Sequence, residues 1–377
     1  MVTIKDFSAT MDLPYYMPCL YPPIHEQLKI LHIPSKLSLL MNLRLSALPC
    51  VYVSNHDRSQ VNKTVLWASD VLGYYDEYSY LGVKVNIQES SSFESGLELI
   101  NETLNQGNVF IASGTTYYLP YSTDYLSESY KESLNHPILG ARNHFLGVYG
   151  LENDYVYIYD PKPWKFMDKI KIEDFGRFWK GDSYVEHLDK DLTQSLLVMG
   201  QASIDKLREP MNESEINELF LKLLKTLSVE FLQGEVIDNS YYFGKSFYKK
   251  IFERIQNAME TGMDKKTFEL FYYRFLFEMK FGKYFFKDLL LEHSEILESI
   301  DLNIIDYLLE TIRMLELSLN TLLIKMTRKN ANLSVSLNEF ALKLSEIESR
   351  DNKLFNEINT KLSQVTVLKK KQQSNNT

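Results

Sequence analysis

Residues 143–161 read NHFLGVYGLENDYVYIYDP, and this stretch decides the fold of the first half of the chain. Two runs rich in aromatic and β-branched residues flank Leu151–Asn153, which predicts a β-hairpin with Gly150 supplying turn chemistry. Counting outward from this loop places His144 directly opposite Asp160. Residues that face each other across a hairpin have Cβ atoms roughly 4.5–5.5 Å apart. The hairpin therefore predicts an imidazole paired with a carboxylate.

The identity of the acid depends on the register of this hairpin. A shift by one residue would turn Asp160 to the other face of the sheet. In that case Asp154 or Asn143 would become the candidate. Pro161 restricts Asp160 to extended backbone and ends the strand there.

Cys19 is the candidate nucleophile that such a pair would serve. It stands in LPYYMPCLYPPIHEQL, residues 13–28, directly before an expected helix over Pro22–Ile33, whose two prolines suit a first turn. Unpaired N–H groups and the helix dipole favour a thiolate at a helix N-terminus. The alternative is a buried structural cysteine, because free cysteines are among the most buried residues. Cys50, in LPCVYV, is expected to be a core residue of a strand over Leu48–Ser54.

His144 has rivals as the catalytic base, but none stands on a strand of a readable hairpin with an acid opposite. They are His25, His32, His56, His136, His187 and His293. An early cysteine with a later histidine and acid is the chain order of a papain-like active site. The Cys19 thiolate would attack an acyl carbon, His144 would protonate the leaving group, and Asp160 would orient the imidazole.

The composition describes a soluble globular protein, with 45% hydrophobic and 24% charged residues. A net charge of -9 argues against broad nucleic-acid binding. Two cysteines point to a reducing compartment, and the lack of CxxC or HExxH spacing gives a zinc site no support. The N-terminus has no signal core, and Asn42, Arg44 and Pro49 interrupt the most apolar stretch, 37–53. We expect a cytoplasmic protein with no membrane span and no metal or cofactor of its own.

The chain length predicts two domains. We expect an α+β catalytic domain over residues 1–204 and an all-α helical domain over residues 205–377. The tail LKKKQQSNNT is expected to fray. Apolar residues at helical spacing predict further helices. These are Ser92–Asn105, a helix from Asn212 through Phe231 with Glu215 as capping partner, Lys245–Glu260, Lys265–Leu291, Ile296–Lys325 and Leu337–Val365. Asp351 interrupts the last stripe, which indicates bundle packing rather than a long coiled coil.

The hairpin with its NHF and DP ends, followed by KIKIEDFGRFW (residues 169–179), resembles the papain-like cysteine-peptidase fold, an N-terminal helix plus an antiparallel sheet. More narrowly, it is similar to the N-terminal domain of the butirosin acyltransferase family. FIASGTTYYLPY (residues 110–121) resembles the strand before the active-site loop in that group. The chain is also compatible with the papain-like amide-forming enzyme associated with closthioamide biosynthesis. The resemblance covers about residues 10–185.

This resemblance implies an acyltransferase or amide synthase of natural-product biosynthesis. The donor would be a thioester on the phosphopantetheine arm of an acyl or peptidyl carrier protein, and the acceptor an amine such as a diamine. Papain-like sites commonly place a glutamine shortly before the cysteine, whereas this chain has none before Gln27. Oxyanion stabilisation would instead use backbone N–H groups, with Tyr15, Tyr16 or Asp12 nearby.

Two other functions stay open on the sequence alone. A peptidase or thioesterase would use the same three residues with water as acceptor, and a catalytically silent chain would be an interaction scaffold. Tyr117–Tyr130 and the aromatic segment 268–286 could line an acyl tunnel, although bundle core is the plainer interpretation of the latter. A basic face could receive an acidic carrier protein, or be merely solvated. Its candidates are Lys245, Lys249, Lys250, Arg254, Lys280, Lys283 and Lys287. A homodimer is compatible with the bundle.

Overall fold

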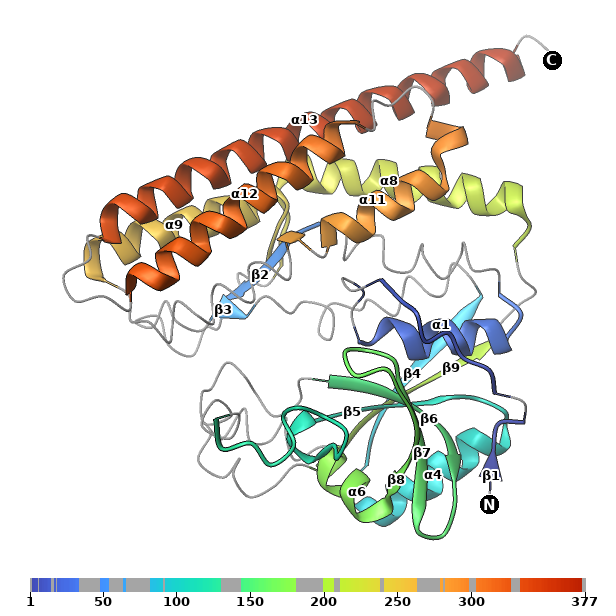
Figure 1. Ribbon diagram of the computed structural model, residues 1–377. Coiled ribbons are helices and arrows are strands. Elements are labelled where there is room, and N and C mark those ends of the chain that lie inside the picture. Colours follow the sequence, from blue (N-terminus) through green and yellow to red (C-terminus); the bar gives the residue numbers. More distant parts are fainter. Residues whose placement is uncertain are drawn as a thin grey trace. The chain divides into compact units, whose positions relative to one another are not determined.

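The computed structural model of the chain describes residues 2–5, 7–14, 17, 19–33, 48–53, 64–65, 82–90, 92–129, 144–180, 199–206, 211–237, 241–262, 279–280, 282–297, 303–326 and 333–374. These residues form an α+β protein, as predicted. The chain divides into two compact units, one comprising Met1–Ser38 with Gly73–Pro210 and the other Leu39–Leu72 with Met211–Thr377. We call them the sheet unit and the helical unit (Figure 1).

This division differs from the predicted boundary between residues 204 and 205 in one important respect. The strand β2 (Cys50–Val53) pairs with β11 (Tyr241–Phe243), so an early segment of the chain belongs to the helical unit. The expected strand at Leu48–Ser54 is present, and Cys50 lies opposite Phe243. A pairing between segments so distant along the chain leaves no local signal in the sequence.

The described part of the sheet unit contains one seven-stranded antiparallel sheet in the order β4-β9-β5-β6-β7-β8, with β1 also paired to β6. The predicted hairpin is present as β6 and β7. The strands are β1 (Val2–Thr3), β4 (Val83–Ser90), β5 (Phe110–Gly114), β6 (His144–Leu151), β7 (Tyr155–Asp160), β8 (Phe166–Lys171) and β9 (Met199–Lys206).

Helices cover both faces of this sheet (Figure 1). The helices α4 (Phe93–Asn105) and α6 (Ile172–Lys180) pack on the face that carries the main core. That core is built from Ile100, Leu104, Phe110, Leu146, Val148, Val156, Ile158, Phe175, Phe178 and Trp179, among others. Ser92 caps α4 by accepting a hydrogen bond from the Ser95 N–H.

The helix α1 (Tyr21–Ile30) lies against the opposite face and is fixed there by buried polar contacts. The Gln27 side chain donates to Asn108 Oδ1 at 2.6 Å and accepts from the Val109 N–H at 2.5 Å. The helix packs against β6 at Gly147, where a Cβ would lie 3.4 Å from Pro23 Cβ, an ordinary contact distance. These contacts set the position of the helix that follows Cys19.

The helical unit contains five long helices in its described part, and Figure 1 shows α12 and α13 running side by side. The helices are α8 (Glu213–Gln233), α9 (Lys245–Thr261), α11 (Gly282–Glu292), α12 (Asn303–Met326) and α13 (Leu333–Ser374). The expected capping box of Asn212 and Glu215 opens α8. The prediction of an all-α domain is wrong, because this unit also has a small antiparallel sheet. Its strands are β10 (Val236–Ile237), β11, β2 and β3 (Thr64–Val65).

Asp351, the residue that interrupts the apolar stripe of α13, is buried in the helical unit. Its carboxylate forms an ion pair with Lys283 Nζ at 2.8 Å and accepts a hydrogen bond from the Tyr248 hydroxyl. The Lys283 ammonium also lies 5.3 Å from the ring centroid of Phe355 and 5.8 Å from that of Phe231. The predicted bundle packing therefore holds, with a polar cluster at its centre.

The C-terminal segment differs from its prediction. The helix α13 continues to Ser374, through most of the tail that we expected to fray. The helix expected over Lys265–Leu291 is described only from Met279, and α11 begins at Gly282.

Candidate active site

The hairpin is present, but its register differs from the prediction. The strand β6 ends at Leu151 and β7 begins at Tyr155. Near the turn, Gly150 pairs with Tyr157, and the register then shifts, so that Gly147 pairs with Tyr159. Continuing this register by one residue places Asp160 opposite Leu146 rather than opposite His144.

The shift of register at Tyr149 decides which face of the sheet carries the acid. Without it, the pairing near the turn would continue and Asp160 would lie opposite Gly147, on the face away from His144. With it, Asp160 lies diagonally across from His144 on the same face. Diagonal neighbours are about 7–8 Å apart at Cα, which an imidazole can span. The predicted pair therefore forms for a different geometric reason.

His144 and Asp160 form a hydrogen-bonded pair that is almost closed to solvent. His144 Nε2 lies 2.8 Å from Asp160 Oδ2, and the two residues are 4% and 1% exposed. An ionised carboxylate only accepts hydrogen bonds, so Nε2 carries the proton. Nδ1 is the other ring nitrogen, and Cys19 lies close enough to the imidazole for its charge and a hydrogen bond to help raise the pKa of His144. The structure thus brings together all three predicted catalytic residues.

The electrostatics of this cluster favour a charged imidazole. Burial alone would lower the pKa of His144, but the charges of Asp160 and Cys19 and their hydrogen bonds outweigh it and raise this pKa to about 10. At neutral pH, His144 is therefore protonated, an imidazolium beside the carboxylate of Asp160. Cys19 forms no disulfide, and the residue is half-buried.

The segment that leads to Cys19 is tied to the end of the hairpin. The Tyr159 hydroxyl donates to the Thr10 carbonyl at 2.6 Å, and Lys162 Nζ donates to the Leu13 carbonyl at 2.6 Å. Partial burial beside Lys165 lowers the pKa of Lys162. These bonds connect the backbone before the sulfur directly to the strand that ends in the acid. Cys19 and Asp160 therefore share one framework.

Sequence reasoning missed two residues that surround the pair. The Trp164 ring stands edge-on to His144, with 5.2 Å between ring centroids. The Tyr121 hydroxyl donates to Asp160 Oδ2 at 2.8 Å. Both residues lie in loops, where no periodic pattern marks them. The only signal was the unusual density of tyrosines after β5.

Gly114, the last residue of β5, pairs with His144 and has no room for a side chain. A Cβ at this position would lie 2.2 Å from the Phe178 carbonyl oxygen. The same carbonyl accepts a hydrogen bond from the Thr115 N–H at 3.0 Å. The loop that carries Tyr121 therefore begins at a point where β5 is in direct contact with α6.

Of the residues predicted to stabilise the oxyanion, the structure describes only Asp12. Tyr15 and Tyr16 lie outside the described residues. Asp12 is exposed and forms an ion pair with Lys165 at 2.5 Å, which lowers the pKa of Asp12. Pro22 and Pro23 leave the start of α1 short of N–H donors, so the N–H groups of residues 19–21 remain the nearest candidates by sequence.

The rival histidines that the structure describes have other surroundings. His25 lies on α1, where its Nδ1 is 3.5 Å from the Tyr21 hydroxyl, and burial lowers its pKa. His293 stacks on Phe220 in the helical unit, with centroids 3.9 Å apart. His32, another of the predicted rivals, lies just after the end of α1. His56, His136 and His187, like Asn143, lie outside the described residues.

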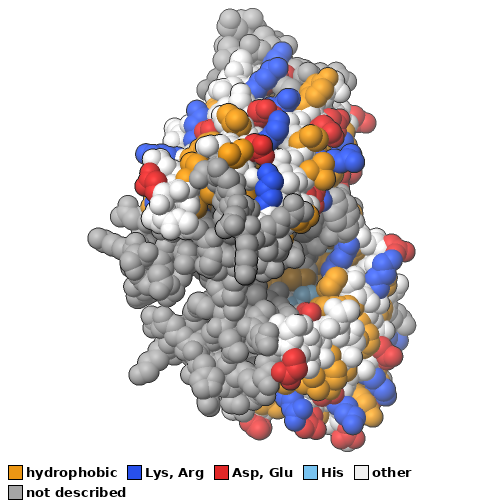
Figure 2. Space-filling view, turned by 60° about the vertical axis from the view of Figure 1, so that its left-hand side comes forward, with side chains coloured by type: hydrophobic (Ala, Val, Ile, Leu, Met, Phe, Trp, Pro, Cys, Tyr) orange, Lys and Arg blue, Asp and Glu red, His pale blue; other side chains and the backbone are white. Residues whose placement is uncertain are grey.

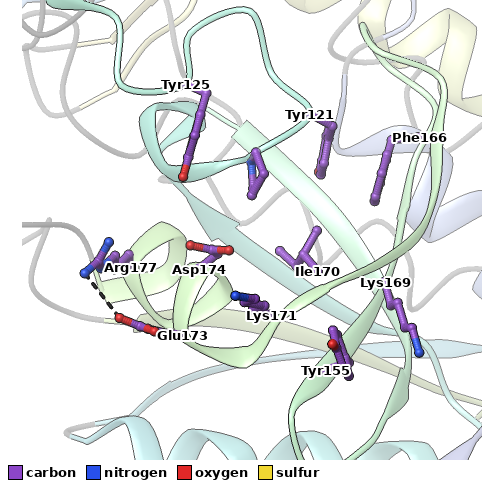
Figure 3. A pocket seen from close by; sticks show the side chains of 11 residues that line it. Tyr121, Tyr125, Tyr155, Phe166, Lys169, Ile170, Lys171, Glu173, Asp174 and Arg177 are labelled. Carbon is purple, nitrogen blue, oxygen red and sulfur yellow. Dashed lines mark hydrogen bonds and ion pairs between the residues drawn. The ribbon is translucent and has the colours of Figure 1, made fainter.

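A groove of about 480 Å³ lies between the Tyr121 loop, β8 and α6. Figure 3 shows Tyr121 and Phe166 side by side on one wall, and the Arg177–Glu173 ion pair on the other. The lining includes Tyr121 and Tyr125 but neither Cys19 nor His144. Two tyrosines of the segment 117–130 thus line a groove, and its use as an acyl tunnel stays a prediction. In the aromatic segment 268–286, the described Met279, Phe285 and Phe286 are buried in the bundle, as its plainer interpretation predicted.

The predicted basic face for a carrier protein does not form as a single patch. Arg254 and Lys283 are buried. Several of the remaining candidates are paired with carboxylates, namely Lys250 with Glu253, Lys280 with Glu316, and Lys287 with Asp306. Figure 2 shows basic and acidic side chains interspersed over the described surface that faces the viewer. Lys249 is the exposed candidate of α9.

Within the described ranges, no three metal-binding side chains gather into a group, and no helix has the length and apolarity needed to cross a membrane. A scan against models of protein families finds no match to this sequence, and a search of curated proteins finds no significant one. The geometry of the Cys19 cluster therefore carries the functional argument.

Proposed function

We propose that this chain is a cysteine-dependent acyltransferase with a papain-like catalytic unit, which forms amides in natural-product biosynthesis in the cytoplasm. The observation that carries the proposal is the series Cys19–His144–Asp160, in which a half-buried cysteine lies beside a buried imidazole that is hydrogen-bonded to a carboxylate. The similarity to the butirosin acyltransferase family supports the choice of reaction.

The first half of the reaction loads the enzyme. The Cys19 thiolate attacks the acyl carbon of a thioester on the phosphopantetheine arm of a carrier protein, and the bond from that carbon to the carrier's sulfur breaks. The imidazolium of His144 gives its Nδ1 proton to the departing sulfur, which leaves as a free thiol. Asp160 keeps the opposite nitrogen protonated throughout.

The second half follows from the same electrostatics. Once Cys19 is acylated, its negative charge is gone, and one of the groups that raise the pKa of His144 is lost. The imidazole that remains neutral after the first half can now take a proton from the attacking amine. The amine nitrogen bonds to the acyl carbon, the bond to Cys19 breaks, and the thiolate–imidazolium pair is restored. The products are one amide and one carrier thiol.

Hydrolysis and aminolysis differ in which acceptor is held beside the acylated sulfur. His144 and Asp160 are nearly inaccessible, and the Trp164 ring lies against the imidazole. Water is smaller than any amine, so this burial alone does not favour the amine. Aminolysis requires an amine positioned beside Cys19, and the choice of this acceptor rests on the family resemblance.

Intact-protein mass spectrometry with an acyl-pantetheine thioester tests this function. We expect an acyl adduct on Cys19 that a diamine converts to free amide. Cys19→Ala should show neither adduct nor product. Cys50→Ala, which removes the chain's other cysteine, is the matched control and should behave as wild type.

Each outcome of this experiment has a distinct meaning. An adduct that yields only free acid, with or without diamine, would replace the transferase by a thioesterase or peptidase. The absence of any adduct on Cys19 would refute acyl-enzyme chemistry.

A further inference from the structure

Asp160 receives two hydrogen bonds on one oxygen. His144 Nε2 and the Tyr121 hydroxyl each lie 2.8 Å from Asp160 Oδ2. A buried carboxylate is stable only when donors surround it. Two donors that converge on one oxygen also fix the rotation of the carboxylate, so that its charge points at the imidazole.

Tyr121 is itself held firmly from the side away from Asp160. Its ring stacks on Phe166, with 3.7 Å between centroids and 6° between planes. Phe166 is the residue paired with Asp160 across β7 and β8. The Tyr121 ring therefore packs on the residue that lies directly across the sheet from Asp160, the acid that its hydroxyl contacts.

The loop around Tyr121 is closed by its own hydrogen bonds. The Thr116 hydroxyl donates to Asp124 Oδ2 at 2.8 Å, and the Leu126 N–H donates to the Tyr117 carbonyl at 3.0 Å. The hydroxyl of Tyr121 thus reaches the acid from a preformed loop. Such rigidity is what a group needs to orient another group at little entropic cost.

The hydroxyl remains a donor over the whole working range of pH. Burial, followed by the charge of Asp160 and the hydrogen bond to it, raises the pKa of Tyr121 well above its usual value. Tyr121 therefore neither competes with His144 for protons nor adds a negative charge. Burial, then the charges of Glu26 and Asp160, also raise the pKa of Tyr159.

We infer that Tyr121 is a positioning residue of the active site, which holds Asp160 turned toward His144 and thereby maintains the thiolate–imidazolium pair. This inference rests on the proposed role of Cys19 and His144, but it concerns the resting enzyme and needs no acyl substrate. Tyr121 acts through Asp160, the residue that its hydroxyl contacts.

The rate at which iodoacetamide alkylates Cys19, measured against pH, tests the inference. In Tyr121→Phe the carboxylate can turn its charge away, so the imidazolium is less stabilised. We expect the rate at neutral pH to fall about tenfold, and the pH at which the thiolate forms to rise. The matched control is Tyr125→Phe, which removes the same atom from the same groove and should keep the rate within about twofold of wild type.

A double variant separates positioning from general structural support. Because Tyr121 acts through Asp160, adding Tyr121→Phe to Asp160→Asn should cause no further loss of reactivity, whereas independent effects would multiply. If Tyr121→Phe folds poorly, Phe166→Leu keeps the hydroxyl but loosens its anchor, and a smaller fall of the same kind is expected.

The results also separate this inference from the proposed function. Equal pH profiles for Tyr121→Phe and Tyr125→Phe, or additive losses in the double variant, would overturn the positioning role. If the wild-type enzyme forms no amide, but Tyr121→Phe still changes the rate and pH dependence of Cys19 alkylation as expected, only the acyltransferase proposal is overturned.

Discussion

Two buried carboxylates, one in each unit, are held in nearly the same way. In the sheet unit, Asp160 pairs with His144 and accepts from the Tyr121 hydroxyl. In the helical unit, Asp351 pairs with Lys283 and accepts from a tyrosine hydroxyl as well. Each set joins an acid, a cation and a phenol from separate elements. The hydrogen-bonding pattern alone therefore does not distinguish a site from a structural cluster.

The surroundings of the two clusters distinguish them. Lys283 is 1% exposed and lies near the rings of Phe231, Phe286 and Phe355, so reagents in solution do not reach it. The imidazole of His144 instead has the half-buried Cys19 beside it. A buried polar cluster becomes a candidate for chemistry when one of its members can both react and be reached.

The largest expected contrast comes from matched Asp→Asn changes. Asp160→Asn offers an amide that can donate to Nε2 and favour the wrong tautomer, so the rate of Cys19 acylation should fall about 10³–10⁴-fold. Asp351→Asn should leave the rate per folded molecule unchanged. Single-turnover acylation followed by mass spectrometry measures both. Equal losses in the two variants would mean that the clusters do not differ in kind.

Stability should show the opposite order. Asp351→Asn leaves the Lys283 ammonium buried without its counter-charge, which should lower the free energy of unfolding by about 3–5 kcal/mol. Urea denaturation followed by helical circular dichroism measures the change. The double variant Lys283→Met/Asp351→Leu removes both charges and should recover most of the loss. Failure to recover would show that packing around Asp351, rather than its charge, is what matters.

The smallest predicted effect concerns the titration of His144. Its pKa is raised from 6.5 to about 10, so the stability that it contributes is complete below about pH 6.5 and is lost as the pH rises toward 10. The pKa of His144, measured by NMR, should fall in Cys19→Ala and fall further in Asp160→Asn, because Asp160 is the stronger of the two raising groups. About one unit between wild type and Cys19→Ala corresponds to about 1.4 kcal/mol. The reverse order would contradict the assigned electrostatics.

The sequence predicted the members of the candidate site better than their geometry. Strand alternation and an early cysteine identified Cys19, His144 and Asp160, because these signals are local. The register shift at Tyr149 has no such signal, and the predicted direct opposition of His144 and Asp160 was wrong. The pairing near the turn differs from the prediction by three residues, and the register shift at Tyr149 takes back one of them. The net difference is two residues, an even number, so Asp160 stays on the same face of the sheet as His144.

Other features escaped because they depend on contacts between distant segments. Tyr121 and Trp164 reach the pair from loops, and β2 joins the helical unit through β11. By contrast, the charge at Asp351 within an apolar stripe correctly indicated bundle packing. A polar residue at an apolar position was informative, whereas residues outside any periodic pattern were not.

The irregular pairing at Tyr149 has a consequence for how this hairpin can diverge. Between His144 and Asp160, exchanging one side chain for another is far safer than changing the length of the chain. Deleting one residue there would leave a hairpin that still folds but presents its carboxylate to the wrong layer of the protein. In any homologous sequence, an insertion or deletion of a single residue in this interval should therefore coincide with loss of the acid or with a compensating change of length.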